Sequence, residues 1–400
     1  MQKVLRPLVC SLAFLLVACG GGNVETASEG KALSGPPGEV PMEPLEMLNA
    51  GRIASNNGFT VSLATDGKVY AWGANADGQL GNNSAYGSNI PVSVSGLSSV
   101  RVVQAGANWA TALDKTGVIW SWGSNSYGQL GLSQVSVSRV AVKVPGISNV
   151  KAIANGLTHA VAVKSDGSVW GWGSMSSPNR YTPTRVGLSD VKAVSAGSFY
   201  TVALKTDGTV WAWGNNTYGQ LGNGTTQYAS TPVKVTGLNG VLAISAGYDH
   251  VLALMSDGTV KTWGRNNYGQ LGNGSAHSSS LPVTVANLTN VKAIAAGGLH
   301  SMAVKNDGTV VAWGNGDYGQ LGNGVRGKQA KPVAVYWINN AVAISAGYSH
   351  SAVLQADGNL NSFGLNTRGE LGNFTYSSSY VPVFAVGTNG GGRLNLGTLP

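Results

Sequence analysis

Short apolar runs separated by turns dominate the chain, and residues 201–222 (TVALKTDGTVWAWGNNTYGQLG) show the pattern most completely. Two alternating apolar runs, residues 202–204 and 210–213, flank the dipeptide Asp207-Gly208. Alternation of this kind is typical of a half-buried strand. A two-residue Asp-Gly turn needs positive φ at both positions, which glycine adopts freely and aspartate tolerates. The stretch therefore predicts a β-hairpin.

The same pattern occurs seven times. Asp-Gly begins at positions 66, 166, 207, 257, 307 and 357, and Thr116-Gly117 replaces it in the second copy. Six residues after each of these positions an aromatic residue precedes glycine: Trp72, Trp122, Trp172, Trp213, Trp263, Trp313 and Phe363. Successive aromatics are 50, 50, 41, 50, 50 and 50 residues apart. Each copy contains about four strand-like runs, which is the size of a propeller blade. The sequence predicts an all-β, seven-bladed β-propeller with four antiparallel strands per blade.

The full repeat resembles the regulator of chromosome condensation repeat. It has three parts, A-G-x-x-H, then A-L-K-x-D-G-x-V-x-x-W-G, then N-x-x-G-Q-L-G, and it covers roughly residues 50–387. The resemblance implies a seven-bladed propeller. It implies no single function, because the family includes nucleotide-exchange factors, ubiquitin-ligase modules and secreted inhibitors, and a fold does not determine function.

The first residues have the features of an export signal. Lys3 and Arg6 precede an apolar run at 8–18 that is too short to span a bilayer. The run ends in Leu-Val-Ala-Cys, which resembles the bacterial lipoprotein signal box. That resemblance implies a signal peptide at residues 1–19, lipidation of Cys19 and, because Gly20 and not aspartate follows, the outer membrane. An ordinary secretory signal with an incidental cysteine is the alternative.

The ends of the repeat region leave ring closure open. Residues 20–49 are rich in Gly, Glu, Ser and Pro and predict a flexible tether. Residues 40–45 stand where a strand would precede the first repeat, so they are one candidate for closing the last blade. Residues 381–386 are the other candidate. The segment 388–400 is interpreted as a C-terminal tail or a closing strand.

Composition excludes few functions. Charged residues make up 10% of the chain, which fits an exported globular domain and not a nucleic-acid-coating one. Net charge is +8, and loss of Lys3 and Arg6 with the signal would leave +6. A mildly basic surface favours anionic partners such as acidic glycans, or serves solubility alone. Without Cys10, only the modified Cys19 remains, so no disulfide is expected.

One ring of equivalent positions carries Phe59, Trp109, His159, Tyr200, His250, His300 and His350. Four histidines suggest a metal or acid–base cluster. Metal ligands must converge to about 2.0–2.2 Å from one ion, however, whereas equivalent positions on different blades diverge. We therefore expect a structural role, with each histidine hydrogen-bonded inside its own blade. The sequence contains no nucleophile–base pattern or phosphate-binding loop. A non-enzyme without cofactor or metal is expected.

A second ring, two residues before the Trp-Gly aromatic, breaks the repeat symmetry. Four adjacent copies carry Tyr70, Trp120, Trp170 and Trp211, and the other three carry Lys261, Val311 and Asn361. Lysine and asparagine are rarely buried without partners, so we expect an exposed position. An arc of exposed aromatics is a plausible platform for a sugar or a protein. Packing between blades that tolerates several side chains is the alternative.

The third copy breaks the symmetry differently. Residues 174–181 replace its Gly-Gln-Leu-Gly loop, and the missing loop predicts a notch on one face. Arg180 and Tyr181 lie within it in sequence, with Arg139, Lys143 and Arg185 nearby. Deletions in repeat proteins often fall on the face used for binding. Harmless decay of one repeat is the alternative.

Two functions follow. The leading hypothesis is a membrane-anchored, non-catalytic binding propeller whose face opposite the tether recognises an envelope protein or glycan, and not nucleic acid. Guanine-nucleotide exchange is implied by the family resemblance alone. No copy carries a wedge-like insertion for disturbing a GTPase, and an exported protein would not meet cytosolic GTPases.

Overall fold

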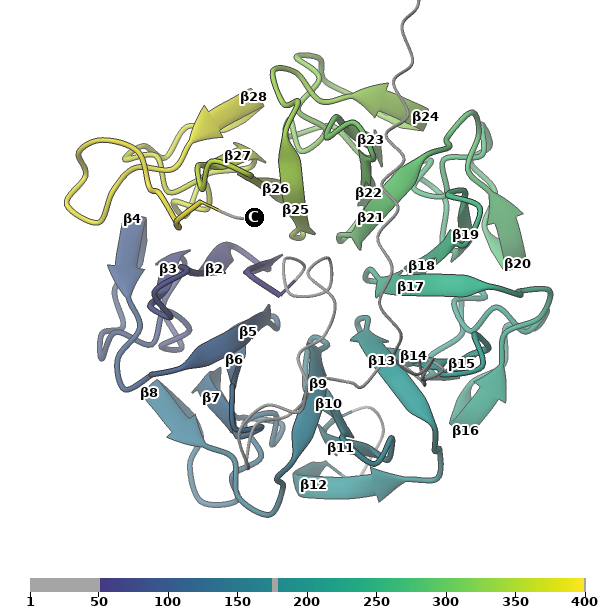
Figure 1. The fold of residues 1–400 in the computed structure, drawn as a ribbon, viewed down its shortest axis with the longest axis horizontal. Coiled ribbons are helices and arrows are strands. Elements are labelled where there is room, and N and C mark those ends of the chain that lie inside the picture. The colour runs from purple at the N-terminus through teal and green to yellow at the C-terminus, as the bar shows by residue number, and fades with distance from the viewer. Residues whose placement is uncertain (1–50, 175–178, 399–400) are drawn as a thin grey trace, which may run out of the picture. The chain divides into compact units, whose positions relative to one another are not determined.

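The computed structural model describes residues 51–174 and 179–398, and the described residues form a seven-bladed β-propeller (Figure 1). Twenty-eight strands make seven sheets, each of four antiparallel strands in chain order. The predicted all-β class, blade number and strand number per blade are confirmed. The predictions for residues 1–19, with Cys19, for the 20–49 tether and for the 40–45 run concern residues outside the described ones.

Each blade places its first strand beside the central channel and its fourth at the periphery (Figure 1). The first strands are β1 (Ile53–Asn56), β5 (Val100–Ala105), β9 (Val150–Asn155), β13 (Val191–Ala196), β17 (Val241–Ala246), β21 (Val291–Ala296) and β25 (Ala341–Ala346). The second strands are β2 (Phe59–Leu63), β6 (Trp109–Asp114), β10 (His159–Lys164), β14 (Tyr200–Lys205), β18 (His250–Met255), β22 (His300–Lys305) and β26 (His350–Gln355).

The hairpin partners of the second strands bear the Trp-Gly aromatics. These third strands are β3 (Val69–Gly73), β7 (Ile119–Ser124), β11 (Val169–Gly173), β15 (Val210–Gly214), β19 (Val260–Gly264), β23 (Val310–Gly314) and β27 (Leu360–Gly364). The fourth strands are β4 (Ser88–Ser93), β8 (Val137–Lys143), β12 (Arg180–Val186), β16 (Ala229–Lys234), β20 (Ser279–Thr284), β24 (Gln329–Ala334) and β28 (Ser379–Phe384).

The Asp-Gly hairpins form where they are expected but with a different turn. Gly208 has φ of +79°, whereas Asp207 is absent from the residues with positive φ. The Gly208 N–H donates to the Lys205 carbonyl, and the Lys205 N–H donates to the Thr209 carbonyl. This is a longer turn with one left-handed glycine, not the two-residue turn. The Asp207 carboxylate instead accepts from the N–H and hydroxyl of Thr209, so its role is to cap the turn.

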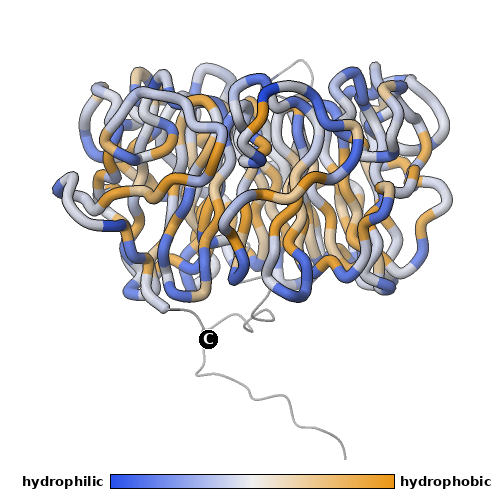
Figure 2. The backbone as a smooth tube through the Cα atoms, turned by 90° about the horizontal axis from the view of Figure 1, so that it is seen from above, coloured by the Kyte–Doolittle hydropathy of each residue, from blue (hydrophilic) through white to orange (hydrophobic). Residues whose placement is uncertain are grey.

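The propeller has two loop faces, with apolar segments concentrated between them (Figure 2). The Asp-Gly face carries the hairpins between second and third strands and the linkers from one blade to the next. The opposite face, named the GQLG face, carries the loops between first and second strands and the Gly-Gln-Leu-Gly loops between third and fourth strands. Every first strand begins at the Asp-Gly face. Gly51, the first described residue, comes just before β1 and therefore lies at that face.

The core is divided into clusters that lie between neighbouring blades. At the junction of blades four and five, Tyr200 and Val202 pack with Val251 and Trp263, and Leu238 of the inter-blade linker completes the cluster. All five side chains are almost fully buried. Burial of apolar surface contributes about 25 cal/mol per Å². Each blade is therefore stabilised mainly by its neighbours.

The C-terminal segment fills the one junction that has no linker, between blades seven and one. The fourth strand β28, which contains most of the 381–386 run, pairs with β27 inside blade seven. The chain then turns back, and Leu394 and Leu396 are buried in one cluster with Ile53 of blade one and Leu360 of blade seven. The backbone N–H of Leu396 donates to Gly358, and its carbonyl accepts from the N–H of Thr65.

A buried arginine completes this junction. Arg52 is 6% exposed, and its guanidinium donates to the carbonyls of Leu63 and Leu396. Burial lowers the pKa of Arg52. The tail thus contacts both blades where every other junction has a covalent linker. Within the described part of the chain, no helix is long and apolar enough to cross a membrane.

Candidate binding site between blades three and four

The histidine ring is buried and joins neighbouring blades. Each Nε2 lies 2.8 to 3.1 Å from a hydroxyl of the next blade, in the pairs His159–Thr201, His250–Ser301, His300–Ser351 and His350–Thr60. The expectation of hydrogen bonds inside each blade is therefore wrong. The side chains extend sideways from the second strand, so the nearest hydroxyl belongs to the next sheet.

The environment of these histidines keeps them neutral. Burial lowers the pKa of His159, His250 and His300 to about 3 and that of His350 to about 4. Desolvation disfavours the charged imidazolium, and a hydroxyl partner does not compensate it as a carboxylate would. Among the described residues, no three His, Cys, Asp or Glu side chains lie close enough to hold a metal ion.

The aromatic arc is half-buried, not exposed. Tyr70, Trp120, Trp170 and Trp211 lie on the third strands, one per blade and near the Asp-Gly face. Each packs partly against a core cluster between blades. The expectation of an exposed position is wrong because a third-strand side chain at this register faces the neighbouring blade. Asn361 at the same register is 3% exposed.

The indole N–H groups of the arc have internal partners. Trp120 donates to the Asp114 carboxylate at 3.1 Å, and Trp170 and Trp211 donate to the hydroxyls of Ser168 and Thr209 at 3.2 Å. A ligand would have to compete with these contacts. The arc keeps some exposed apolar surface, but its three indole N–H groups are already satisfied.

The tryptophans of the Trp-Gly ring also form hydrogen bonds between neighbouring blades. Five of the indole N–H groups donate to the backbone carbonyl of the Gln or Glu in the preceding blade's Gly-Gln-Leu-Gly loop. These pairs are Trp72–Glu370, Trp122–Gln79, Trp172–Gln129, Trp263–Gln220 and Trp313–Gln270, at 2.8 to 2.9 Å. The loop of one blade therefore both covers and satisfies the tryptophan of the next.

Trp213 in blade four breaks this pattern. Blade three, which precedes it, is the copy that lacks the Gly-Gln-Leu-Gly loop. Trp213 is 2% exposed, and its Nε1 is buried with no hydrogen-bond partner among the residues that the structure describes. A buried donor without a partner costs about 1–3 kcal/mol. The missing loop has therefore left an unsatisfied donor in the fold.

A pocket of about 200 Å³ lies between blades three and four, lined by residues of β11, β12, β15 and β16. Trp213 and Trp172 line it together with Arg180, Arg185 and Tyr228. Both arginines and Tyr228 are exposed, and no carboxylate is among the described lining residues. Arg180 and Arg185 make the described lining of this pocket cationic, and Trp213 forms part of its wall. The pocket suits an occupant that brings a carbonyl or carboxylate oxygen.

The predicted notch residues separate in the structure. Arg180 lines the pocket, as does Arg185. Tyr181 lies instead against the blade-two loop, where a Cβ on Gly128 would be 3.0 Å from its Cδ1. Arg139 lies under the blade-one loop at Gly78, and Lys143 pairs with Trp120 in blade two, so neither lines the pocket.

Sequence reasoning missed Trp213 and Tyr228. Trp213 looked like one regular member of a seven-fold ring, because the partner of its N–H belongs to another blade. The absent loop in copy three was a visible signal. Only the cross-blade pairing shows that this absence affects blade four.

Replacement of Trp213 by phenylalanine tests the unsatisfied donor. Trp263→Phe is the matched control, because both indoles occupy equivalent buried sites and both variants lose the same atoms. We expect Trp263→Phe to lower the free energy of unfolding by about 1–3 kcal/mol more than Trp213→Phe, since only Trp263 has a hydrogen bond to lose. Urea unfolding followed by circular dichroism measures both. Equal losses would show that the Trp213 donor is satisfied in solution.

Comparisons with known proteins agree with this architecture. The family model of the RCC1-like domain matches residues 16–347, and that of the regulator of chromosome condensation (RCC1) repeat matches residues 341–370. The crystal structure of Prp20p from Saccharomyces cerevisiae, described with its binding to Gsp1p and histones, is similar with a TM-score of 0.74. Its sequence is 21% identical, over 87% of this chain and 90% of that chain.

Two further solved structures share the fold. Yeast RCC1 (Prp20) bound to Kap60 gives a TM-score of 0.73 at 21% identity, covering 92% of each chain. Human WBSCR16 gives 0.72 at 23% identity, covering 80% of this chain and 94% of that chain. A search of curated proteins finds no match.

Proposed function

Because the chain belongs to the family of RCC1-like domains, we propose that it is a non-catalytic binding propeller that receives a protein partner in the notch between blades three and four. The partner is a protein of the cell envelope. It supplies a loop whose backbone carbonyl takes the place of the missing Gly-Gln-Leu-Gly carbonyl. The unsatisfied N–H of Trp213 is the observation that carries this proposal.

The chemistry of the pocket favours a loop with an acidic residue. A carbonyl oxygen accepts the Trp213 N–H in the way that the Gln220 carbonyl accepts from Trp263 at 2.9 Å. Arg180 and Arg185 offer planar donors that match a carboxylate in bidentate geometry. Tyr228, 52% exposed, adds a large amphipathic contact surface. Burial of Trp213 from solvent makes a new hydrogen bond there more valuable than one at the rim.

The notch is preferred to the aromatic arc as the binding site. The indoles of Trp120, Trp170 and Trp211 already donate inside their own blades, so a glycan gains little from them. The notch also opens beside Gly214, at the GQLG end of β15, and Gly51 lies at the opposite face. A partner in the notch would therefore not compete with the chain that precedes Gly51.

Capture from an envelope extract tests the proposal. The variant Trp213→Phe with Arg180→Ala should retain about tenfold less of the partner that the parent protein captures, because it lacks the buried donor and one cation. The control is Lys331→Ala with Trp263→Phe. It also removes one positive charge and one indole, but outside the notch. Binding is compared per folded molecule after measuring thermal unfolding. Equal capture by both variants would place the site elsewhere.

We further propose that Cys19 carries a lipid that holds the propeller at the outer membrane. The motif that ends at Cys19 supports this attachment, and residues 20–49 give a tether long enough to free the domain from the bilayer. Intact-mass analysis of the mature protein should show a lipidated N-terminal cysteine, and Cys19→Ala should abolish membrane retention. An unmodified N-terminus after Cys19 would contradict the anchor.

A further inference from the structure

The central channel contains a second pocket, separate from the notch. Its volume is about 560 Å³, and all seven first strands line it. Its walls are small and apolar, with Ala152, Ala193, Ile244 and Ile294 among the lining residues. Pockets of about 300–1,000 Å³ with apolar walls and a few placed polar groups are typical small-molecule sites. Ser195, Ser245 and Ser345 of the first strands add hydroxyl groups to the lining.

Four cations surround the Asp-Gly end of the channel. Arg101, Lys151, Lys192 and Lys292 occupy the second position of β5, β9, β13 and β21 and all line the pocket. Arg101 donates to the backbone carbonyls of Val150 and Lys151, which holds its guanidinium toward the next blade. The remaining three blades have Gly51, Leu242 and Val342 at this register. Leu242 is 53% exposed, so solvent reaches its side chain at this end.

Lys151, Lys192 and Lys292 have no acidic counterparts among the described residues that line the channel. No Asp or Glu is among the described lining residues, and none of the three lysines takes part in an ion pair within the described part of the chain. Like charges around one mouth repel one another, and low-dielectric walls focus their field into the channel. A negatively charged group placed at this ring would relieve the repulsion.

The opposite end of the channel is narrowed by tyrosine. Tyr248 lies 4.9 Å from Tyr348 between ring centroids, and its hydroxyl is 3.3 Å from Oδ1 of Asn56. These contacts reach from blade five to blades seven and one, across the end of the channel. Glycine at position 298 makes the arrangement possible, because a Cβ there would be 2.5 Å from Cδ2 of Tyr348.

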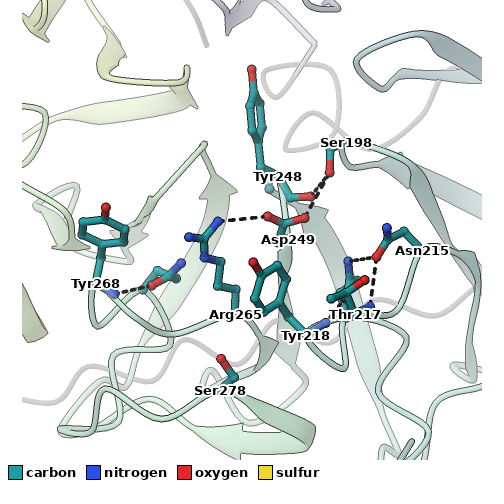
Figure 3. Close-up of polar contacts among 12 residues, drawn as sticks. Ser198, Asn215, Thr217, Tyr218, Tyr248, Asp249, Arg265, Tyr268 and Ser278 are labelled. Atoms are coloured by element: carbon teal, nitrogen blue, oxygen red, sulfur yellow. Dashed lines mark hydrogen bonds and ion pairs between the residues drawn. The ribbon is translucent and has the colours of Figure 1, made fainter. Parts of the chain in front are cut away.

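Polar contacts on the GQLG face hold the backbone that carries Tyr248. The Ser198 hydroxyl donates to the Tyr248 carbonyl at 2.5 Å and to Asp249 at 3.2 Å, and Asp249 pairs with Arg265 at 3.4 Å. Arg265 in turn lies over the Tyr218 ring. Figure 3 shows the Tyr248 ring pointing away from this ion pair. Burial raises the pKa of the Tyr248 hydroxyl, so it stays neutral and presents an aromatic surface.

We propose that the channel pocket binds a small amphipathic anion, with a phosphate or carboxylate head at Lys151, Lys192 and Lys292 and an apolar body extending toward Tyr248. A narrow far end favours a ligand of finite length over a polypeptide that threads the channel. The cations attract the phosphate or carboxylate head of the ligand. The alanine and isoleucine walls and the tyrosine rings contact its apolar body. This site is independent of the notch.

Calorimetric titration of the mature protein with 1-naphthyl phosphate tests the proposal. One molecule should bind per chain, with a dissociation constant below about 1 mM. Inorganic phosphate, which lacks the body, and 1-naphthol, which lacks the charge, should each bind at least about tenfold more weakly. A second titration uses decyl phosphate below its critical micelle concentration. Tighter binding of decyl phosphate indicates a lipid-derived ligand, and tighter binding of naphthyl phosphate a soluble aromatic one.

Charge variants locate the site. Lys151→Gln with Lys192→Gln and Lys292→Gln should weaken both phosphate esters by about tenfold or more and reduce the salt dependence of binding. Lys143→Gln with Lys234→Gln and Lys331→Gln, on the outermost strands, removes the same charge and should leave binding unchanged. Equal weakening by the two triple variants, equal affinity for 1-naphthol, or absence of saturable binding by both esters would each overturn the proposal.

Discussion

Lowering the pH from about 7.5 to about 4.5 is expected to remove most of the stability of the propeller. His159, His250, His300 and His350 have a folded-state pKa of about 3 or 4, against an ordinary value of 6.5. Below pH 6.5 the unfolded chain binds protons that the folded chain excludes, so stability falls with pH until the folded pKa is reached. Two pH units correspond to roughly 3 kcal/mol for each histidine. Four histidines together approach the total stability of an ordinary domain, about 5–15 kcal/mol.

One buried acid acts in the opposite direction. Burial raises the pKa of Glu370, so its protonation favours the folded state as the pH falls. A single glutamate does not offset four histidines. The net expectation is acid unfolding well above the pH at which the turn aspartates titrate.

A single substitution separates the histidines from other acid effects. His300→Gln retains a group that can hydrogen-bond to Ser351 but has no proton to gain. Its loss of stability between about pH 7.5 and 4.5 should be smaller than that of the parent by about 2–3 kcal/mol. His277→Gln, at an exposed position, is the control and should leave the pH profile unchanged. Urea midpoints at the two pH values measure the difference, and parallel profiles for His300→Gln and the parent would contradict the assignment.

Removal of the C-terminal segment is expected to lower the free energy of unfolding by an amount similar to that lost at low pH. Deletion of residues 387–400 takes Leu394 and Leu396 out of the junction between blades seven and one. It also removes the hydrogen bond that the Leu396 N–H donates to Gly358 and those that the Leu396 carbonyl accepts from Thr65 and Arg52. Loss of a buried leucine typically costs about 2–5 kcal/mol, and here Arg52 also loses a buried acceptor. We expect the free energy of unfolding to fall by roughly 5 kcal/mol or more.

The double variant Leu394→Ala with Leu396→Ala distinguishes packing from chain length. It should reproduce most of the loss caused by the deletion. Arg393→Ala, on the exposed side of the same segment, lies over the Phe384 ring and should cost under about 1 kcal/mol. Thermal and urea unfolding measure all three. If the deletion melted like the parent, the segment would have no part in closing the ring.

Local chemistry explains why the repeat was predictable. Glycine with positive φ after Asp207, the alternation at 210–213 and the buried Leu221 each depend on residues a few positions apart. Seven copies of such a unit leave few architectures other than a closed ring, because each blade must cover the next. The amino-acid sequence alone therefore determined the all-β class, the seven blades, the four strands in each and the position of the missing loop.

Contacts between blades were decided only by the tertiary structure. The partner of the Trp263 indole is a carbonyl 43 residues away, and the hydroxyl that meets His250 is 51 residues away, so no local pattern contains either pair. Trp213 became distinctive only when the preceding blade was placed beside it. The cations of the central pocket became one ring only when four first strands converged. Sequence periodicity specifies each sheet through short-range propensity, whereas a binding surface arises where different sheets bring unlike residues together in space.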